Sequence, residues 1–539
     1  MLLYSPMVKL LDFWAPWCID PQTPVLTENG YIQASKVKIG QRLVTIDPKT
    51  KKQSIKTVQK VRVFKDISSK KIVLETGREL IGDTNHLVLT QEGFKRLADL
   101  TVGEKVLVDP IFKPEIDQLN DKSVALARLL GFVMTDGYLY EDLEHRIHET
   151  HFFVGTKQDA EQIKNDLQSL GFNKLEVKKR ANKRIIDGRE FVITTYRCRS
   201  FEKSLFELLK SKGTPVGRKK NQSYFIPDWI MDGDISTKRS FLSGWLGGDG
   251  CKIDYYIKHD GASSHNAGFK VNAIEFHKGK ELEKEGILYA KQLGFLLEEL
   301  GVKVNQIDSI DDEDGVIISV RLATDYQSLF NLANIGYAYA KTKNTNTPFI
   351  KEFLQYRLLE RDRYIQVKQV ALQQLALGIH KQVISQSLQV SVGTIDSWKY
   401  NKATVTTHPP LSGQARFDDW LIDRQQNELL WEKVSLINEV DNRDVIGITV
   451  SNPHTIVTNG IVSHNCGPCR IMNPILDELE KELGSKVTID KINVDENQEM
   501  ASKYGVMSIP TYVVLKDDKE VGRKIGVTSK SDLLQLIQS

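Results

Sequence analysis

A two-cysteine motif is divided between the two ends of this chain. The stretch "DFWAPWC" ends at Cys18, and the stretch "CGPCR" begins at Cys466. Joining Trp17 directly to Cys466 gives "DFWAPWCGPCR", a C-x-x-C pair in a strand-and-helix context. The two ends of the chain are therefore predicted to form one small α/β domain, interrupted by an insert over residues 18–465.

Hydrophobic patterning divides the insert into several folding units. Short alternating runs with Gly turns, such as "KIVLETGRELIGDTNHLVLT", predict an all-β domain from Cys18 to about Val108. Long helical patterns separated by basic strands predict an α/β domain from about Lys122. Strand patterns resume at "EKVSLINEV" and "DVIGITV", which indicates that the last strands complete the first β domain. A chain of 539 residues is accordingly expected to hold roughly three or four domains.

Charge and cysteine content narrow the class of protein. The formal net charge is only +3, so contact with nucleic acid would depend on local basic surfaces. The 5 cysteines are too few for a disulfide framework in a chain of this length, which favours a reducing compartment. The start "MLLYSPMVKLLDFW" lacks a small-residue cleavage site, and no run of about 18 apolar residues occurs. We therefore expect a soluble cytoplasmic protein without a membrane partner.

The residues at both ends of the insert match those of a protein-splicing reaction. The insert begins with Cys18 and ends with "HN", and the next residue is Cys466. With "GDTNHLVLT" and "NPHTIVTNG" inside it, the segment resembles an intein with an all-β Hint domain. The resemblance implies that the Cys18 thiol attacks the preceding carbonyl to form a thioester, because sulfur is both a good nucleophile and a good leaving group. Cys466 then takes over the acyl group, and Asn465 cyclises to release the insert.

Three histidines and one aspartate complete the site that this resemblance implies. His464 is placed to assist the cyclisation, and His86 occupies the position of the family's N-terminal histidine, with a near-neutral pKa suited to proton transfer. His454 matches the family's other C-terminal histidine. Asp83 stands where the family usually has threonine, and Gly447 stands where it often has an aspartate that tunes the first cysteine. These two departures bear on the rate and coordination of the steps.

Two segments of the predicted α/β domain carry a repeated signature. "LARLLGFVMTDGYL" contains Asp136 and "FLSGWLGGDG" contains Asp249, and both resemble the helices of LAGLIDADG homing endonucleases. In that family the two helices pack through small residues, here Gly131, Ser243 and Gly244. The resemblance implies that Asp136 and Asp249 hold Mg²⁺ at the scissile phosphates of DNA, where metal ions activate water and stabilise the leaving oxygen. The presence of both carboxylates favours an active nuclease.

Basic residues are expected to complete the nuclease. The family carries a lysine after each half, and the corresponding positions here are Lys220 in "RKKNQSYFIPDW" and Lys343 in "IGYAYAKTKN". The basic strand over residues 178–184 is predicted to lie on phosphates or in the major groove, with a solvated charged strand as the alternative. The expected partner is double-stranded DNA of the host allele that lacks the intein, cut at the insertion point.

The segment that follows resembles a helix-turn-helix. Within "ALQQLALGIHKQVISQSLQVSVGTIDSWKY", a turn is predicted at Val390-Ser391 and a groove-reading helix over residues 392–399. The predicted small core consists of Leu375, Ile384, Leu388, Val390, Ile395 and Trp398. A plain helical hairpin is the alternative for this segment.

The joined motif "DFWAPWCGPCR" and the later "MSIPTYVV" resemble those of thioredoxin. The resemblance implies that Cys466 is the redox nucleophile, with a thiolate favoured by a helix start, and that Cys469 is the resolving thiol. Asp12 matches the family's buried acid, and Pro510 matches its cis-proline. The implied partners are disulfide-containing proteins and a thioredoxin reductase-type electron donor, and neither splicing nor the host is expected to need a cofactor. Few residues precede Asp12, so either the host is shortened or its true start lies upstream.

The predicted organisation is multidomain. In chain order the boundaries are 1–17 for the N-terminal host segment, 18–118 for the first part of the Hint domain, 119–360 for the α/β endonuclease, 361–402 for the helix-turn-helix segment, 403–427 for a linker, 428–465 for the second part of the Hint domain and 466–539 for the C-terminal host segment. The leading interpretation is a self-splicing precursor that yields a thioredoxin-like oxidoreductase and a DNA endonuclease. Two alternatives stay open: a precursor that binds DNA but does not splice because of Asp83 and Gly447, and an autoprocessing domain that only cleaves.

Overall fold

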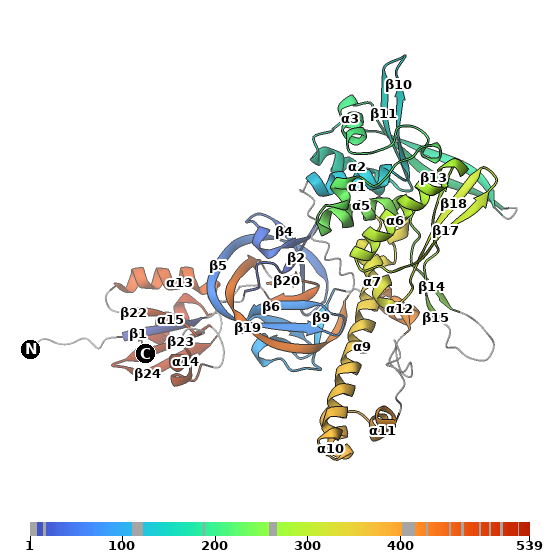
Figure 1. Cartoon of the computed structure of the whole chain (residues 1–539). Coiled ribbons are helices and arrows are strands. Elements are labelled where there is room, and N and C mark those ends of the chain that lie inside the picture. The colour runs from blue at the N-terminus through green and yellow to red at the C-terminus, as the bar shows by residue number, and fades with distance from the viewer. Residues whose placement is uncertain are drawn as a thin grey trace, which may run out of the picture. The chain divides into compact units, whose positions relative to one another are not determined.

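The chain forms two compact units (Figure 1). The first unit comprises Met1–Ile116 and Asp423–Ser539, and the second comprises Asp117–Ile422. The computed structural model describes residues 8–14, 18–109, 122–186, 189–257, 267–400, 416–426, 429–451, 454–464, 468–484, 487–494, 497–506, 510–525 and 528–538. Mixed sheets and helices in these ranges confirm the multidomain prediction. None of the helices in them is both long and apolar enough to cross a membrane.

One sheet of the first unit is built from both ends of the chain. Its strands are β1 (Val8–Trp14), β22 (Val487–Asn493), β23 (Thr511–Lys516) and β24 (Lys519–Ile525). In the described residues their order is β22-β1-β23-β24, and β1 pairs in parallel with β22 and antiparallel with β23 (Figure 1). Both neighbours of β1 therefore come from the far side of the long intervening segment.

Helices cover both faces of this host sheet. They are α13 (Pro468–Leu483), α14 (Gln498–Lys503) and α15 (Lys530–Gln538). Successive residues of β1 point to opposite faces, so Leu10 packs in a core with α13 and α15 while Leu11 packs in a core with α14. The host is consequently a three-layer α/β/α domain.

The rest of the first unit is a closed β structure, which we call the β domain. Its elements are β2 (Pro24–Thr27), β3 (Gly30–Gln33), η1 (Ala34–Lys36), β4 (Arg42–Ile46), β5 (Gln53–Leu74), β6 (Glu79–Asp83), β7 (Leu87–Thr90), β8 (Gly93–Arg96), η2 (Leu97–Asp99), β9 (Lys105–Val108), β19 (Leu430–Val450), β20 (Thr455–Thr458) and β21 (Ile461–His464). Among the described residues the order is β19-β5-β4-β2-β20-β21-β9-β7-β8, with β3 beside β2 and β6 beside β5. The long strands β5 and β19 pair antiparallel, and register shifts let them bend. Because β19 also pairs with β9, the sheet closes on itself.

The second unit is an α/β structure with two halves. Its elements are α1 (Lys122–Val133), β10 (Gly137–Asp142), β11 (Ile147–Val154), α2 (Lys157–Ser169), β12 (Glu176–Ile186), β13 (Arg189–Ser200), α3 (Lys203–Ser211), η3 (Lys219–Asn221), α4 (Asp228–Met231), α5 (Ile235–Gly248), β14 (Asp254–Ile257), β15 (Ala267–Lys270), β16 (Ile274–Lys278), η4 (Lys280–Leu282), α6 (Glu283–Glu299), β17 (Val304–Asp312), β18 (Gly315–Leu322), α7 (Tyr326–Ile335) and α8 (Lys341–Asn344). The sheet β10-β11-β13-β12 packs on α1, α2 and α3, and the sheet β16-β18-β17 packs on α5, α6 and α7. Helix α1 contributes residues to both cores, which joins the two halves.

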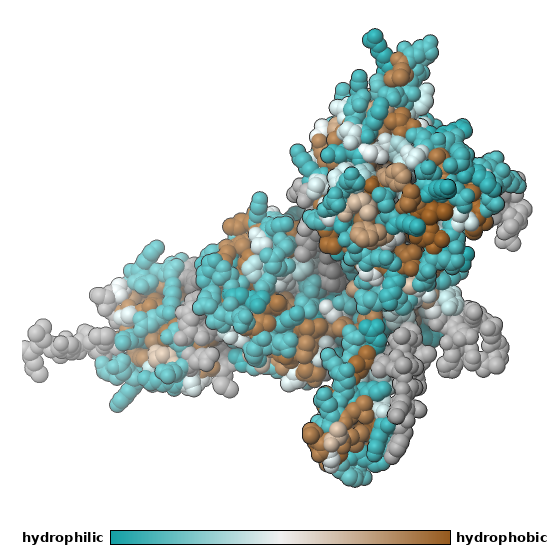
Figure 2. All heavy atoms as spheres, in the orientation of Figure 1, coloured by the Kyte–Doolittle hydropathy of each residue, from teal (hydrophilic) through white to brown (hydrophobic). Residues whose placement is uncertain are grey.

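Helices follow the second half. They are α9 (Thr347–Ala376), α10 (Lys381–Leu388), α11 (Val392–Tyr400) and α12 (Phe417–Gln426). All six predicted core residues of the helix-turn-helix segment lie in one apolar cluster with Ala371 of α9. Apolar surface remains around α10, where Leu377 is 79% exposed and Val383 is 55% exposed (Figure 2). Part of the predicted linker 403–427 is instead helix α12, because Phe417 packs in the core against Phe353, with ring centroids 5.4 Å apart.

Candidate functional site

Cys18 is buried between two strands of the β domain. Its side chain has no exposed surface and packs against Val445. The next residue, Ile19, exchanges backbone hydrogen bonds of 3.1 and 2.7 Å with Ile446 of β19. On its other side Ile19 bridges to Gly82 of β6. The start of the predicted insert is therefore fixed by strands from both parts of the sheet.

Asp83, at the end of β6, contacts the backbone of Cys18 on two sides. The Cys18 N–H donates to one carboxylate oxygen of Asp83, and the Asp83 N–H donates to the Cys18 carbonyl at 3.1 Å. The other carboxylate oxygen accepts the N–H of Asn85 at 2.9 Å. The nitrogen of Cys18 belongs to the peptide bond that follows Trp17. A buried carboxylate therefore lies at the nitrogen of the predicted scissile bond.

His86 lies in the turn after β6, where its N–H donates to the Asp83 carbonyl at 3.0 Å. The ring is buried, and neither of its nitrogens has a hydrogen-bond partner among the described residues. Burial, followed by the charge of His464, lowers the pKa of His86 to about 3. The expectation of a near-neutral pKa is therefore wrong, because the closed sheet removes the imidazole from water and disfavours its charged form.

Gly82 permits the close approach of these groups. A Cβ atom at this position would lie 2.8 Å from the Cys18 carbonyl oxygen and 3.2 Å from the Cβ of His86. Any side chain would therefore push the first residue of the insert away from the histidine. The sequence alone pointed to no role for this glycine.

His464 ends β21, which pairs with β7, the strand that follows His86. The His464 ring meets Phe94 edge-on with centroids 4.9 Å apart, and the His454 ring centroid is 6.2 Å away. Nδ1 of His454 lies 3.1 Å from the carbonyl oxygen of Val450, which can only accept, so Nδ1 carries the proton. The structure brings the three predicted histidines into one region of the β domain.

The remaining residues predicted for this site are less completely described. Asn465 and Cys466 lie outside the described residues. Cys469 belongs to the first turn of α13. Gly447 lies on β19 opposite Arg62 of β5, so this strand brings no carboxylate at that position.

In the second unit, α1 and α5 cross with their backbones in direct contact. A Cβ atom on Gly131 would lie 2.1 Å from a carbonyl oxygen of α5, and one on Gly244 would lie 2.0 Å from a carbonyl oxygen of α1. These two glycines pack as the sequence predicts. Ser243 differs, because its hydroxyl oxygen accepts the N–H of Ala338 at 3.2 Å in the segment after α7.

Asp136 and Asp249 follow the C-terminal ends of these crossing helices. Burial raises the pKa of both carboxyl groups, and the charge of Asp136 is the second cause that raises the pKa of Asp249 to about 6. No described residue donates a hydrogen bond to either carboxylate. Two neighbouring carboxylates whose oxygens are not engaged within the described chain fit the hard oxygen donors that Mg²⁺ prefers.

Two lysines place ammonium groups at the ends of the same helices. Nζ of Lys343 donates to the Gly247 carbonyl at 2.8 Å, and Nζ of Lys219 donates to the Thr135 carbonyl at 2.6 Å. Burial lowers the pKa of both lysines, to about 8 for Lys219. The charges of both lysines lower the pKa of Asp136 and Asp249, which partly offsets the rise caused by burial and favours the ionised carboxylates.

Lys220, which the sequence favoured for this role, does not lie at the carboxylates. Its ammonium is 3.9 Å from Asp314 at the surface. The short turn η3 is held by Lys278, whose ammonium donates to the Lys219 carbonyl at 3.2 Å. Neighbouring side chains of a single 3₁₀ turn point in different directions, so only Lys219 faces the helix ends. The string "RKKNQ" has no periodicity that could distinguish the two lysines.

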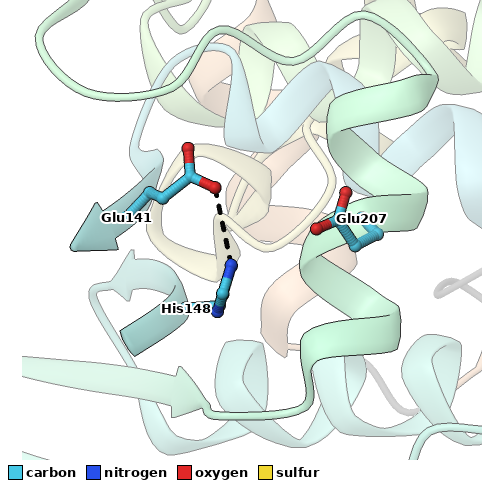
Figure 3. Close-up of side chains that lie close together, drawn as sticks. All are labelled: Glu141, His148 and Glu207. Carbon is cyan, nitrogen blue, oxygen red and sulfur yellow. Dashed lines mark ion pairs between the residues drawn. The ribbon is translucent and has the colours of Figure 1, made fainter. Parts of the chain in front are cut away.

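A second group of possible metal ligands lies in the first half of this unit. Figure 3 shows Glu141 facing His148, with Glu207 across from both on α3, and their ligand atoms lie within 4.8 Å of one another. The ammonium of Lys210 lies 3.2 and 3.3 Å from the two carboxylate oxygens of Glu141. Because Glu141 is already paired with Lys210 and His148, we assign this carboxylate a structural ion-pair role.

One sheet of the second unit presents a basic face. Alternate residues of β13 pack into the core, while Arg197 and Arg199 lie on the opposite face, with Lys178 of β12 in register beside Arg197. The outer face of the sheet β16-β18-β17 instead carries Glu275 and Asp308. The basic charge of the first sheet is partly neutralised, because Glu149 lies 4.0 Å from Arg197 and 3.7 Å from Arg199, and Glu176 lies 2.9 Å from Lys178.

The host sheet holds a buried acid. Asp12 lies in β1 opposite Lys491 of β22 and Tyr512 of β23, and it is 3% exposed. Burial raises the pKa of Asp12 to about 7, against the opposing charge of Lys491. Pro510 is buried directly before β23. The domain thus combines a carboxyl group that titrates near neutral pH with a helix whose first turn contains Cys469.

An α/β domain with the second cysteine of a C-x-x-C sequence in the first turn of a helix, and with a buried acid in its sheet, is typical of thiol-disulfide exchange domains. The sequence profile of the thioredoxin family matches residues 448–539. Thioredoxin of Bacillus subtilis is 54% identical over 72 residues, which cover 13% of this chain and 69% of that protein. The chain therefore belongs to the thioredoxin family through its C-terminal segment.

Other proteins are similar to a larger or different part of the chain. The tRNA-splicing ligase RtcB of Pyrococcus furiosus is 25% identical over 534 residues, which cover 88% of this chain and 52% of that protein. The chain thus spans about half the length of this relative. A solved DnaB intein from Synechocystis sp. PCC 6803 is 19% identical, with 17% of this chain and 68% of that chain covered and a TM-score of 0.17.

Proposed function

We propose that this chain is a self-splicing precursor in which an intein over residues 18–465 excises itself and joins residues 1–17 to residues 466–539. The closed sheet of the β domain carries the proposal. Ile19, directly after Cys18, and His464, near the end of the insert, both belong to this one sheet, and Cys18 and His86 both lie against Gly82. Excision with ligation requires that the two ends of an insert act together.

The comparisons support an insert with a function of its own. The relative named as a tRNA ligase matches 88% of this chain, whereas thioredoxin matches only 13%. Most of the match to the ligase must therefore lie in residues 18–465, whereas the thioredoxin matches only the host. A self-contained insert that removes itself would account for similar segments in a ligase and in a chain with a thioredoxin host.

The first step is an acyl shift at the Trp17–Cys18 bond. Sγ of Cys18 attacks the carbonyl carbon of Trp17, a C–S bond forms, the C–N bond breaks, and the thiol proton ends on the freed nitrogen. His86 stays neutral at pH 7 because its pKa is about 3. Its imidazole can therefore donate one hydrogen bond and accept another while that proton moves.

The later steps transfer the acyl group and release the insert. The Cys466 thiol attacks the thioester carbonyl, which frees the Cys18 thiol and leaves a branched chain. The side-chain nitrogen of Asn465 then attacks its own main-chain carbonyl, which breaks the bond to Cys466 and closes a succinimide. His464 precedes this residue and can handle the proton that Asn465 loses. A final shift from sulfur to nitrogen restores a peptide bond between Trp17 and Cys466.

Intact masses after expression under reducing conditions test the proposal. Splicing converts the 61.2 kDa chain into products of about 51 and about 10 kDa, with a junction peptide "PWCGPCR". Free fragments without this peptide would favour the alternative of cleavage only. A persistent 61.2 kDa chain that fresh reductant does not change would favour the non-splicing alternative.

A second activity, cleavage of double-stranded DNA by a LAGLIDADG-type endonuclease, is proposed for the second unit. It rests on the two unengaged carboxylates at the ends of helices that cross at Gly131 and Gly244. Asp136 and Asp249 would hold Mg²⁺, which supplies an activated water and stabilises the leaving oxygen. Lys219 adds positive charge at the helix ends, and the basic sheet face together with the helix-turn-helix segment would bind the duplex.

Plasmid cleavage tests the endonuclease. DNA carrying the uninterrupted host sequence should be cut at the insertion point with Mg²⁺ and not with a chelator. Asp136→Asn should abolish cutting, and Glu141→Gln, outside the carboxylate pair, should not. Cutting of a plasmid without the joined host sequence at the same rate would refute site-specific homing.

The spliced host is proposed to act as a cytoplasmic thiol-disulfide oxidoreductase. Cys466 would attack a protein disulfide, Cys469 would resolve the mixed disulfide, and Asp12 could exchange a proton near neutral pH. Pro510 would face the cysteines, and a thioredoxin reductase-type donor would restore the dithiol. Reduction of a protein disulfide by the spliced product, and not by an Asn465→Ala precursor, is the expected result.

A further inference from the structure

A buried carboxylate contacts the nitrogen that the first splicing step sets free. Asp83 has no exposed surface, and one of its carboxylate oxygens accepts the N–H of Cys18. Its second oxygen is held by the N–H of Asn85 at 2.9 Å, and its own N–H donates to the Cys18 carbonyl at 3.1 Å. Two hydrogen bonds therefore join Asp83 to Cys18, one through the carboxylate and one through the backbone, and the bond from Asn85 orients the carboxylate.

The charge of this nitrogen changes during the acyl shift. In the precursor it is a neutral amide, whereas after the C–N bond breaks it is an α-amino group with an ordinary pKa of about 8. At pH 7 that amine takes up one proton from water and becomes an ammonium. A carboxylate in a buried site interacts weakly with the amide N–H and strongly with the ammonium.

We propose that Asp83 is a catalytic residue that displaces the amide–thioester equilibrium toward the thioester by stabilising the ammonium of Cys18. The inference rests on the proposed splicing reaction. The bonds exchanged are those of the acyl shift, one C–S bond formed for one C–N bond broken. Besides the thiol proton, the nitrogen receives one proton from solvent.

The charge of Asp83, rather than its ability to accept a hydrogen bond, supplies this effect. Gly447 brings no carboxylate from its position on β19, whereas the carboxylate of Asp83 contacts the Cys18 nitrogen directly. The same negative charge disfavours the Cys18 thiolate, so the equilibrium and the rate of the shift respond differently to its removal.

The pH dependence of the shift depends on the groups around Asp83. The titratable and charged groups on the neighbouring elements are the thiol of Cys18, the rings of His86 and His464, Lys70 paired with Glu439, and Arg443 paired with Asp20. His86 stays neutral above its low pKa, and each of the two ion pairs joins one basic and one acidic side chain. Between pH 7 and 10 the pH dependence of the acyl shift is therefore expected to come from the new amine and the Cys18 thiol.

Hydroxylamine cleavage measures both quantities in a chain that stops after the first step. In the full chain with Asn465→Ala and Cys466→Ala, cleavage at low hydroxylamine reports the thioester fraction, and cleavage at saturating hydroxylamine reports the rate of the shift. Asp83→Asn and Asp83→Thr are compared with this parent, and the threonine keeps an acceptor without a charge. Asp47→Asn is the matched control, because Asp47 accepts the N–H groups of Lys49 and Thr50 elsewhere in the β domain.

We expect both Asp83 variants to lower the thioester fraction at pH 7 by about ten-fold or more, the effect of one neighbouring opposite charge on the ammonium. The parent should keep its thioester to a higher pH than the variants, and Asp47→Asn should match the parent. Equal thioester fractions and pH profiles in the parent and a folded Asp83→Thr would overturn the inference while leaving splicing intact. Absence of cleavage at Trp17–Cys18 in the parent would overturn both proposals.

Discussion

A single methyl group at Gly244 should separate the paired helices of the second unit. The new Cβ would lie 2.0 Å from the carbonyl oxygen of Arg128 on α1. Relief to an ordinary contact of about 3.5 Å requires the helices to move about 1.5 Å apart. Overpacking of this kind lowers the free energy of unfolding by about 1–3 kcal/mol. Since Asp136 and Asp249 follow these helices, a displacement of about 1 Å at the carboxylates should slow DNA cleavage about 100-fold.

The assay compares Gly244→Ala with Gly155→Ala under the same conditions. Gly155 lies in the same unit, and a Cβ there has nothing within 4 Å. Cleavage of plasmid carrying the joined host sequence is measured with Mg²⁺, together with thermal unfolding. Splicing of both variants should proceed as in the parent, because Cys18 and its histidines belong to the other unit.

Two results would refute this reasoning. If Gly244→Ala unfolds at a lower temperature and still cuts DNA at the parent rate, the helix crossing does not position the carboxylates. If both its unfolding and its cleavage match those of Gly155→Ala, the backbones of α1 and α5 are not in contact at this glycine.

Three further predictions follow from particular groups. Lys219→Met should remove most DNA cleavage and Lys220→Met should not, because only the first ammonium lies at the helix ends; equal plasmid-cleavage rates would contradict this assignment. Asp12→Asn should raise the unfolding temperature of the spliced host at pH 8 and leave it unchanged at pH 4. The folded pKa of Asp12, about 7, exceeds its unfolded value, so the folded domain binds more protons and loses stability as pH rises from about 4 to about 7. Oxidation that pairs Cys466 with Cys469 should stop splicing, because the acceptor thiol is lost; product masses with and without reductant measure this, and equal rates would exclude it.

Features that repeat or that join distant segments could be predicted from the sequence. The divided cysteine motif predicts a host domain made from both ends of the chain, and β1 indeed lies between β22 and β23. Two copies of an apolar helix ending in Asp-Gly predict a helix pair, and Gly131 and Gly244 pack at its crossing. Apolar spacing in the helix-turn-helix segment identifies all six members of its small core, because helical periodicity determines which side chains face inward.

Features that depend on tertiary burial could not be predicted in this way. The low pKa of His86 arises because strands from both parts of the β domain enclose it. Gly82 matters because Cys18, distant in sequence, lies against it. The choice between Lys219 and Lys220 depends on how Lys278 holds a short turn. The local sequence pattern cannot predict these contacts, because each joins residues that are far apart in the chain.

The host domain can tolerate so long an insert because the insert closes on itself. Loop-closure entropy grows only with the logarithm of length, at about 0.6 kcal/mol for each doubling. Here the cost is smaller still, because Ile19 and β21 belong to one sheet, so the folded insert returns close to where it left. With β1 already paired to β22 and β23, the host segments are held together before any bond between them exists. In the proposed splicing reaction, ligation would then be intramolecular within a folded host. Loss of the shared host core should lower the yield of joined product more than the rate of the first acyl shift.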